Sequence, residues 1–165
     1  MDILFVQQLL IAALKTGTPL LLIALGELIC EKSGVMNLGQ EGMMLMGAMA
    51  GFAGTYFTGS LALGLLVALL AGMLMAFLFA VLALSLNTNQ VATGLALTIF
   101  GTGLSAFLGS TLVGNTITGF SAIRIPVLSD IPMLGPILFN QDILVYFSFS
   151  WLPLHGGCCI KHVLD

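Results

Sequence analysis

The side chains that could do chemistry gather in one short stretch, residues 26–42, which reads GELICEKSGVMNLGQEG. It holds carboxylates, a lysine, an asparagine and a glutamine, and three glycines fall within its last nine residues. Because glycines at that density make a poor uninterrupted helix, we expect a break that frees backbone N–H and C=O groups. Those groups, with Asn37, Gln40 and Glu41 beside them, could satisfy the hydroxyls of a polar solute.

Enzyme and metal chemistry find little support in the sequence. There is no nucleophile with a base, no carboxylate pair at working spacing and no phosphate-cradling Gly-rich loop, so we expect no enzyme activity and no ATP hydrolysis by this chain. The end of the chain imitates a zinc site with His155, Cys158, Cys159 and His162. Adjacent cysteines rarely chelate one tetrahedral ion, so we expect neither a metal site nor a cofactor.

The elements that carry these residues are membrane helices. Hydrophobic residues make up 59% of the 165 positions and charged residues only 7%, whereas soluble domains carry roughly a quarter charged residues. Residues 42–123 contain no Asp, Glu, Lys, Arg or His, a run several times longer than the roughly 20 residues that one spanning helix needs. Since backbone groups in lipid must pair internally, the predicted fold class is all-α, a polytopic transmembrane helical bundle with lipid as a partner.

The four basic residues are scattered and do not form a patch. They are Lys15, Lys32, Arg124 and Lys161. This pattern predicts no nucleic-acid partner. It is also too sparse to determine membrane orientation by the positive-inside rule.

Two interpretations of residues 26–42 remain open. The segment is either a surface loop or structural hinge with solvated charges, which we favour, or a break at membrane depth that contacts the solute. Irregular backbone at depth is tolerated only where it is buried in protein or lines a cavity, and ionisable residues there are usually functional. The depth of the segment therefore decides between the two.

Residues 60–86 and 91–113 are the clearest spans, joined by a polar turn, and residues 43–57 form a further apolar helix. Small residues recur every four positions along the first span, which predicts a helix-packing face made of Gly64, Ala68, Gly72, Ala76 and Ala80. The second span has the same spacing of small residues, at Gly94, Thr98, Thr102, Ala106 and Ser110. The two faces suggest a tightly packed pair, although either could pack against another helix.

Polar side chains on and between the spans have two possible uses. Thr98, Thr102 and Ser105 could line a solute pathway, yet threonines and serines in membrane helices most often bond their own helix or a neighbour. The turn residues Asn87, Asn89 and Gln90 are expected to cap helix ends and not to bind ligands.

The two ends of the chain are less regular. Residues 3–25 form either one tilted span in which Lys15 snorkels, or an interfacial helix followed by a new helix near Pro19; we favour the second, since a mid-span lysine is poorly tolerated. Residues 114–141, rich in Pro and Gly, predict an extramembrane loop with a short interfacial helix. The last apolar segment, residues 143–154, is too short to cross a core of roughly 30 Å.

Residues 16–52, TGTPLLLIALGELICEKSGVMNLGQEGMMLMGAMAGF, resemble the permease subunits of bacterial ABC importers of the branched-chain amino acid, ribose and nucleoside superfamily. The shared pattern is GEL, then E-[KR]-S/A-G-V-x-N-L-G-x-E-G-M-M, and it is most similar to the simple-sugar or nucleoside permeases. Residues 89–109, NQVATGLALTIFGTGLSAFLG, fit the same family. Two separated motifs in the right order make the resemblance specific, and it covers about residues 10–150.

The resemblance implies a multi-pass permease component of an ATP-driven importer in the bacterial inner (plasma) membrane. Its substrate would be a nucleoside or simple sugar. The implied partners are a second permease subunit, ATP-binding ABC subunits and an extracytoplasmic solute-binding lipoprotein. The alternative is a truncated membrane fragment with only structural or helix-interaction properties and no transport.

Residues 1–154 are expected to be an incomplete permease domain, and residues 155–165, HGGCCIKHVLD, a non-native tail. Moving the reading frame of the tail by two bases permits TWWLLYKTRVG, because Cys-Cys, for example, then always encodes Leu. That peptide is similar to the helix end and Lys-Thr-Arg segment with which the family continues. We therefore expect a frameshift near residue 150.

Overall fold

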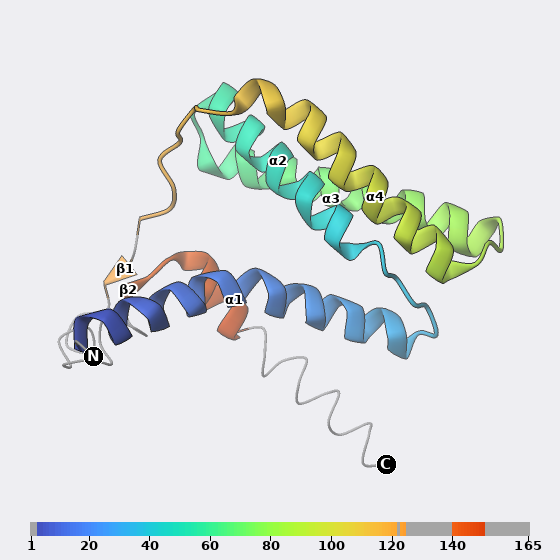
Figure 1. Cartoon of the computed structure of the whole chain (residues 1–165), viewed down its shortest axis with the longest axis horizontal. Helices are drawn as coiled ribbons and strands as arrows, with labels where there is room; N and C mark the ends of the chain where they lie inside the picture. Colours follow the sequence, from blue (N-terminus) through green and yellow to red (C-terminus); the bar gives the residue numbers. More distant parts are fainter. Residues whose placement is uncertain (1–2, 122, 125–139, 151–165) are drawn as a thin grey trace, which may run out of the picture. The chain divides into compact units, whose positions relative to one another are not determined.

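The computed structural model describes residues 3–121, 123–124 and 140–150. Helices dominate these residues (Figure 1), which confirms the all-α class. The chain divides into two compact units, residues 27–119 and residues 1–26 with 120–165. The zinc-like spacing and the expected non-native tail lie outside the described residues, as does the end of the apolar segment beyond residue 150.

Helix α1 (Ile3–Lys32) is continuous, with Pro19 inside it, so the favoured break near Pro19 is wrong. Proline removes only one backbone N–H from the helix ladder, and apolar helix formers follow it over residues 20–25. Side chains also bond carbonyls of the neighbouring turn: Thr18 Oγ1 donates to the Leu14 carbonyl at 2.7 Å, and Thr16 Oγ1 to that of Ala12 at 2.9 Å. Residues 4–32 are long and apolar enough to cross a membrane.

Three further helices build the unit of residues 27–119. They are α2 (Gln40–Thr58), α3 (Leu61–Ala80) and α4 (Gln90–Gly109). Helix α3 runs on into the π-helical turn η1 (Val81–Ser85), and α4 into the 3-10 turn η2 (Ser110–Leu112). Residues 61–85 and 90–112 meet the length and apolarity of a membrane span, which agrees with the two spans predicted from the sequence.

Polar residues close the helix ends, as membrane helices require. The Asn89 side chain accepts from the Ala92 N–H at 3.1 Å and caps α4, which confirms the predicted cap. Gly59, at φ 68°, ends α2 in a left-handed conformation, and its N–H bonds the Thr55 carbonyl at 2.8 Å. Asn87 takes φ 51° in the turn before α4.

Helix α2 is the central element of this unit and packs against both α3 and α4 (Figure 1). Part of each small-residue face therefore meets α2, through Gly64 on α3 and Thr98 on α4, and the expected tight α3–α4 pair is not what forms. Gly64 of α3 is buried so closely that an added Cβ would lie 2.8 Å from the Gly51 carbonyl oxygen. Helix α3 packs against α2 and not mainly against α4, because α2 has small residues of its own at the contact, including Gly51 and Gly54.

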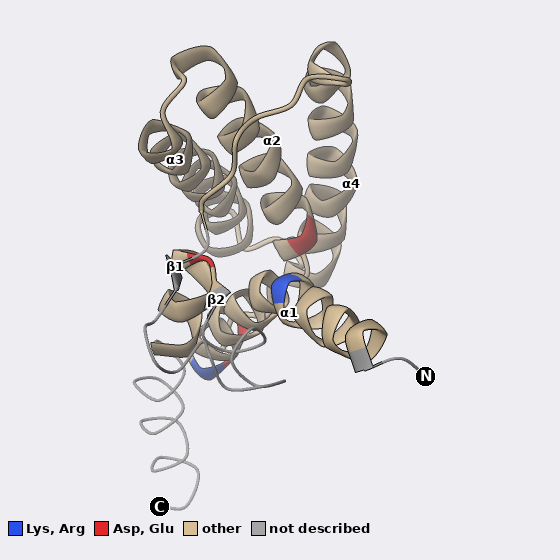
Figure 2. Ribbon diagram, turned by 90° about the vertical axis from the view of Figure 1, so that its left-hand side faces the viewer, with Lys and Arg blue, Asp and Glu red and all other residues tan. Residues whose placement is uncertain are grey.

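The surface of residues 27–119 matches a lipid environment. A small core of Met75, Phe79, Ala83 and Leu97 is buried, while large apolar side chains such as Phe57, Ile99, Phe107 and Val113 are exposed. No charged residue lies on α3 or α4 (Figure 2). Exposed apolar surface on this scale fits lipid and would be unusual in water.

In the other unit, the described part after residue 120 consists of strands β1 (Ile123–Arg124) and β2 (Asn140–Gln141), which pair antiparallel, and helical residues 143–150. Asp142 forms an ion pair with Lys15 of α1 at 3.9 Å. Residues 114–121 are not helical. Residues 125–139, which make up most of the expected loop, lie outside the described residues.

Candidate functional site

The break predicted from the glycines begins at Gly34. Its φ of 80° ends α1 in the left-handed region that glycine favours. The Val35 N–H donates to the Cys30 carbonyl at 3.1 Å and the Gly34 N–H to the Glu31 carbonyl at 2.9 Å. These two bonds form a Schellman motif, after which the chain stays non-helical until α2 begins at Gln40. We call residues 34–39 the broken segment.

The broken segment lies along α4. At its start, the Met36 N–H donates to the Gln90 side-chain oxygen at 2.9 Å; near its end, Thr98 Oγ1 donates to the Leu38 carbonyl at 2.8 Å. Between them, an added Cβ on Gly94 would lie 2.8 Å from the Leu38 nitrogen. Gln90 and Thr98 are eight residues apart on a helix, so the segment follows α4 inward for about 12 Å.

Two side chains hold the broken segment in shape. Asn37 Oδ1 accepts from the Gly39 N–H at 2.9 Å and closes a local turn. Glu27, one turn before the end of α1, accepts with both carboxylate oxygens: from the Asn37 N–H at 3.1 Å and from Gln40 Nε2. Asn37 is 8% exposed, so its polar atoms are satisfied within the protein.

Helix α2 then starts in direct backbone contact with α4. An added Cβ on Gly42 would lie 2.6 Å from the Leu97 carbonyl oxygen, a distance that no real side chain occupies. The contact places the first turn of α2 beside the second and third turns of α4. Glu41 stands in this first turn and is exposed. A carboxylate near a helix N-terminus is stabilised by the helix dipole.

The structure brings part of the predicted solute path together. Asn37 and Gln40 share the Glu27 carboxylate, and Thr98 bonds the residue that follows Asn37. Gln40 is half-buried, Glu41 exposed, and Thr102 exposed with its hydroxyl donating to the Thr98 carbonyl at 2.8 Å. Thr102 thus contacts Thr98 only through its own helix, and among the described residues no side-chain hydrogen bond joins Glu41 to the others.

The predicted helix-packing face divides along its length. Gly64 is buried against α2, and an added Cβ on Gly51 would lie 3.0 Å from the Ala68 Cβ. Farther along α3, an added Cβ on Gly72 meets open space, Ala76 is exposed and Ala80 is half-buried. Only the first turns of α3 therefore use the small residues for contact with α2.

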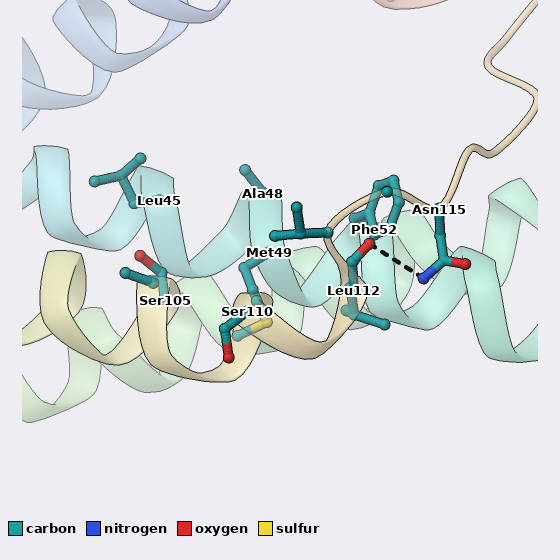
Figure 3. A pocket seen from close by; sticks show the side chains of 12 residues that line it. Leu45, Ala48, Met49, Phe52, Ser105, Ser110, Leu112 and Asn115 are labelled. Atoms are coloured by element: carbon teal, nitrogen blue, oxygen red, sulfur yellow. Dashed lines mark hydrogen bonds between the residues drawn. The ribbon is translucent and has the colours of Figure 1, made fainter.

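A groove opens farther along α2 and α4 (Figure 3), with a volume of about 660 Å³. Three of its polar side chains donate to nearby carbonyls: Ser105 and Ser110 to carbonyls of their own helix turns, and Asn115 Nδ2 to the Leu112 carbonyl at 3.2 Å. The remaining lining is mostly apolar, formed by Leu45, Ala48, Met49, Phe52, Ala106, Gly109, Leu112, Val113 and Gly114. Such a groove suits apolar groups better than a polar solute.

Sequence reasoning missed Glu27 as a site residue, although it stands in the GEL motif. Its partners lie 10 and 13 residues away, beyond the i+4 reach of helical patterns. The groove was also missed, because its two walls come from helices far apart in the sequence. Among the described residues, no group of three His, Cys, Asp or Glu side chains could hold a metal ion.

The sequence is similar to known transport proteins. Residues 9–152 match the family described as branched-chain amino acid transport system / permease component. The chain is 43% identical over 154 residues to the putative glucose ABC transporter permease protein TsgC13 of Haloferax volcanii, covering 91% of this chain and 47% of that protein. It is 34% identical over 160 residues to the guanosine ABC transporter permease protein NupQ of Bacillus subtilis, covering 90% and 49%.

A third relative is the nucleoside ABC transporter permease protein NupC of Lactococcus lactis, 29% identical over 161 residues, covering 89% of this chain and 50% of that protein. The chain thus spans about half the length of the curated relatives it matches. No solved structure matches it.

Proposed function

The chain belongs to the permease component family of the branched-chain amino acid transport system, and we propose that it forms part of the membrane-spanning permease of an ATP-driven importer for a nucleoside or simple sugar. Relatives named for glucose, guanosine and nucleosides support that substrate class. The observation that carries the proposal is the hydrogen bond from Thr98 Oγ1 to the Leu38 carbonyl. It holds non-helical backbone against the side of a helix that is long enough to span a membrane.

The position of the broken segment supports the solute-contact interpretation over the surface-loop interpretation. With α4 spanning, a distance of about 12 Å along it lies well inside a core of roughly 30 Å. Irregular backbone at that depth is stable only where it is buried in protein or lines a polar cavity. Asn37 of the broken segment is buried, and Glu41 in the first turn of α2 is exposed, so the break combines contacts within the protein with a nearby exposed ionisable group.

The candidate path residues take different roles in this proposal. Asn37 Oδ1 and Thr98 Oγ1 form hydrogen bonds with backbone groups of the broken segment and hold it in place. Gln40 and Glu41 are the groups that meet the solute, and Thr102, exposed one turn beyond Thr98, extends the path along α4. Solute passage involves no covalent step, so the chain has no catalytic residue.

The proposed assembly follows the ABC transporters for which the relatives are named. ATP would be hydrolysed by separate ATP-binding subunits, and a second permease subunit would complete the path. An extracytoplasmic solute-binding lipoprotein would deliver the solute. The location would be the plasma membrane, which is the inner membrane in a Gram-negative bacterium.

Uptake in the native host tests the proposal. Deleting the gene is expected to abolish import of labelled guanosine or labelled glucose, and the wild-type gene to restore it. The variant Glu41→Gln is expected to restore import about tenfold less well, equivalent to about 1.4 kcal/mol of lost interaction. Glu31→Gln is the matched control, because Glu31 is an exposed carboxylate in the last turn of α1. Unchanged uptake of both solutes after deletion would reject transport and favour the non-transporting fragment.

A further inference from the structure

Glu27 has no assigned role in transport, yet its carboxylate bonds both the broken segment and the first residue of α2. It is half-buried, and its two carboxylate oxygens receive different donors. Oε1 accepts from the Asn37 N–H at 3.1 Å, and Oε2 accepts from Gln40 Nε2. One side chain of α1 therefore holds both the turn of the broken segment and the first residue of α2.

The chemistry of a carboxylate determines how the Gln40 amide must lie. A carboxylate offers only acceptors, whereas an amide has a donor NH2 on one side and an acceptor oxygen on the other. Gln40 must therefore turn its NH2 toward Glu27 and its Oε1 away. Among the described residues, no hydrogen bond engages Gln40 Oε1, and the side chain is only half-buried.

We propose that Glu27 is a positioning residue that determines the hydrogen-bond polarity of the solute path at Gln40. By holding the amide NH2, Glu27 makes Gln40 present an acceptor oxygen to the path. Solutes that donate a hydrogen bond at this point, through a hydroxyl or an amino group, are then selected over solutes that only accept. This inference rests on the proposed function and adds a specificity determinant to it.

Substitution of Glu27 by its amide makes the inference testable. In Glu27→Gln the amide oxygen can still accept from the Asn37 N–H, so the broken segment keeps that bond. The new NH2 would face the Gln40 NH2, and Gln40 must reverse its amide to restore a bond. Gln40 then presents a donor to the path in place of an acceptor.

The transport experiment uses the complete importer in membrane vesicles, with guanosine and glucose as probes. Glu27→Gln is expected to raise the KM of the transported probe about tenfold with little change in maximal rate, as the loss of one hydrogen bond would. The double variant Glu27→Gln with Gln40→Glu exchanges the two side chains and again places an acceptor toward the path. Its KM is expected to return to within about threefold of the wild-type KM. Glu31→Gln is the charge-matched control and should leave the KM unchanged.

A second measurement examines the amide without transport. In the full chain in lipid nanodiscs, the 15N and 1H resonances of the Gln40 side-chain NH2 are expected to shift in Glu27→Gln and to stay in place in Glu31→Gln. Unchanged Gln40 resonances in Glu27→Gln overturn the positioning role.

The outcomes separate the two proposals. If the wild type takes up a probe and the KM of Glu27→Gln is unchanged, the specificity role is overturned and the importer proposal stands. The same holds if the double variant Glu27→Gln with Gln40→Glu does not recover the KM. Absence of uptake of both probes by the wild type overturns the importer and the specificity role together, and the NMR result alone then decides the orientation of Gln40.

Discussion

Gly42 of α2 and Gly101 of α4 lie backbone against backbone. An added Cβ on Gly101 would stand 2.6 Å from the Gly42 carbonyl oxygen and 2.7 Å from the Gly42 Cα. Only glycine permits this approach, since a methyl group on either residue would have to push the helices apart. Because Gly42 lies in the first turn of α2, the same contact fixes the point along α4 at which the broken segment ends and α2 begins.

Gly101→Ala is expected to destabilise the α2–α4 contact by about 1–3 kcal/mol, the usual cost of forcing atoms into a packed contact. Thermal unfolding in detergent or bicelles measures the change. Gly103→Ala is the matched control in the same helix: its added Cβ meets open space, so it should be neutral or stabilise by about 0.5–1 kcal/mol. Equal stability of the two variants would mean that the two backbones are not in contact.

Helix α3 offers a second glycine pair of the same kind. Gly64→Ala would press a methyl group onto Thr55 and the Gly51 carbonyl oxygen, and we expect a loss of about 1–3 kcal/mol in unfolding free energy. Gly72→Ala lies on the same predicted face but meets open space, so its stability should not fall. If Gly72→Ala were the more damaging of the two, the packing of α3 on α2 would be wrong.

The bond that carries the proposed function can be removed with almost no change of shape. Thr98→Val deletes the hydroxyl that donates to the Leu38 carbonyl and is expected to cost about 1–2 kcal/mol of stability and to increase protease cleavage near residue 38. Thr102→Val removes a hydroxyl that bonds only its own helix, so its cost should stay below about 0.5 kcal/mol. Identical cleavage of both variants would argue against a docked broken segment.

The ion pair between Lys15 and Asp142 is expected to contribute little. Their side chains are 46% and 28% exposed and their charged atoms lie 3.9 Å apart, a geometry worth about 0.5 kcal/mol. A double-mutant cycle with Lys15→Met and Asp142→Asn measures the coupling energy. High salt should abolish the coupling. A coupling above about 2 kcal/mol that resists salt would place the pair in a dry environment.

The sequence predicted the elements whose signals are local. The apolar runs of residues 60–86 and 91–113 agree closely with residues 61–85 and 90–112, because a polar turn with the Asn89 cap marks the boundary between them. The break predicted near Pro19 was wrong, since one missing N–H does not by itself end a helix that continues into the apolar residues 20–25.

The site could be predicted only in part, because its geometry depends on distant contacts. Asn37 and Gln40 were predicted as path residues from their types and the glycines around them. The depth of their segment depends on Thr98 and Leu38, which lie 60 residues apart in the sequence. The role proposed for Glu27 also depends on contacts beyond local patterns, with Asn37 and Gln40 that lie 10 and 13 residues away. The sequence also could not predict that the small-residue face of α3 packs against α2. Periodicity shows which residues share a helix face but not which helix that face contacts.

The charge-free character of α3 and α4 also matters while the protein is being made. The insertion machinery orients helices mainly by nearby Lys and Arg residues, and residues 27–119 contain one such residue, Lys32. The turns at residues 59–60 and 86–89 carry no charge to hold them on either side. We therefore expect the membrane orientation of residues 27–119 to be determined by insertion of α1. Moving the single lysine from residue 32 to residue 59 is the smallest change that we expect to disturb that orientation during synthesis.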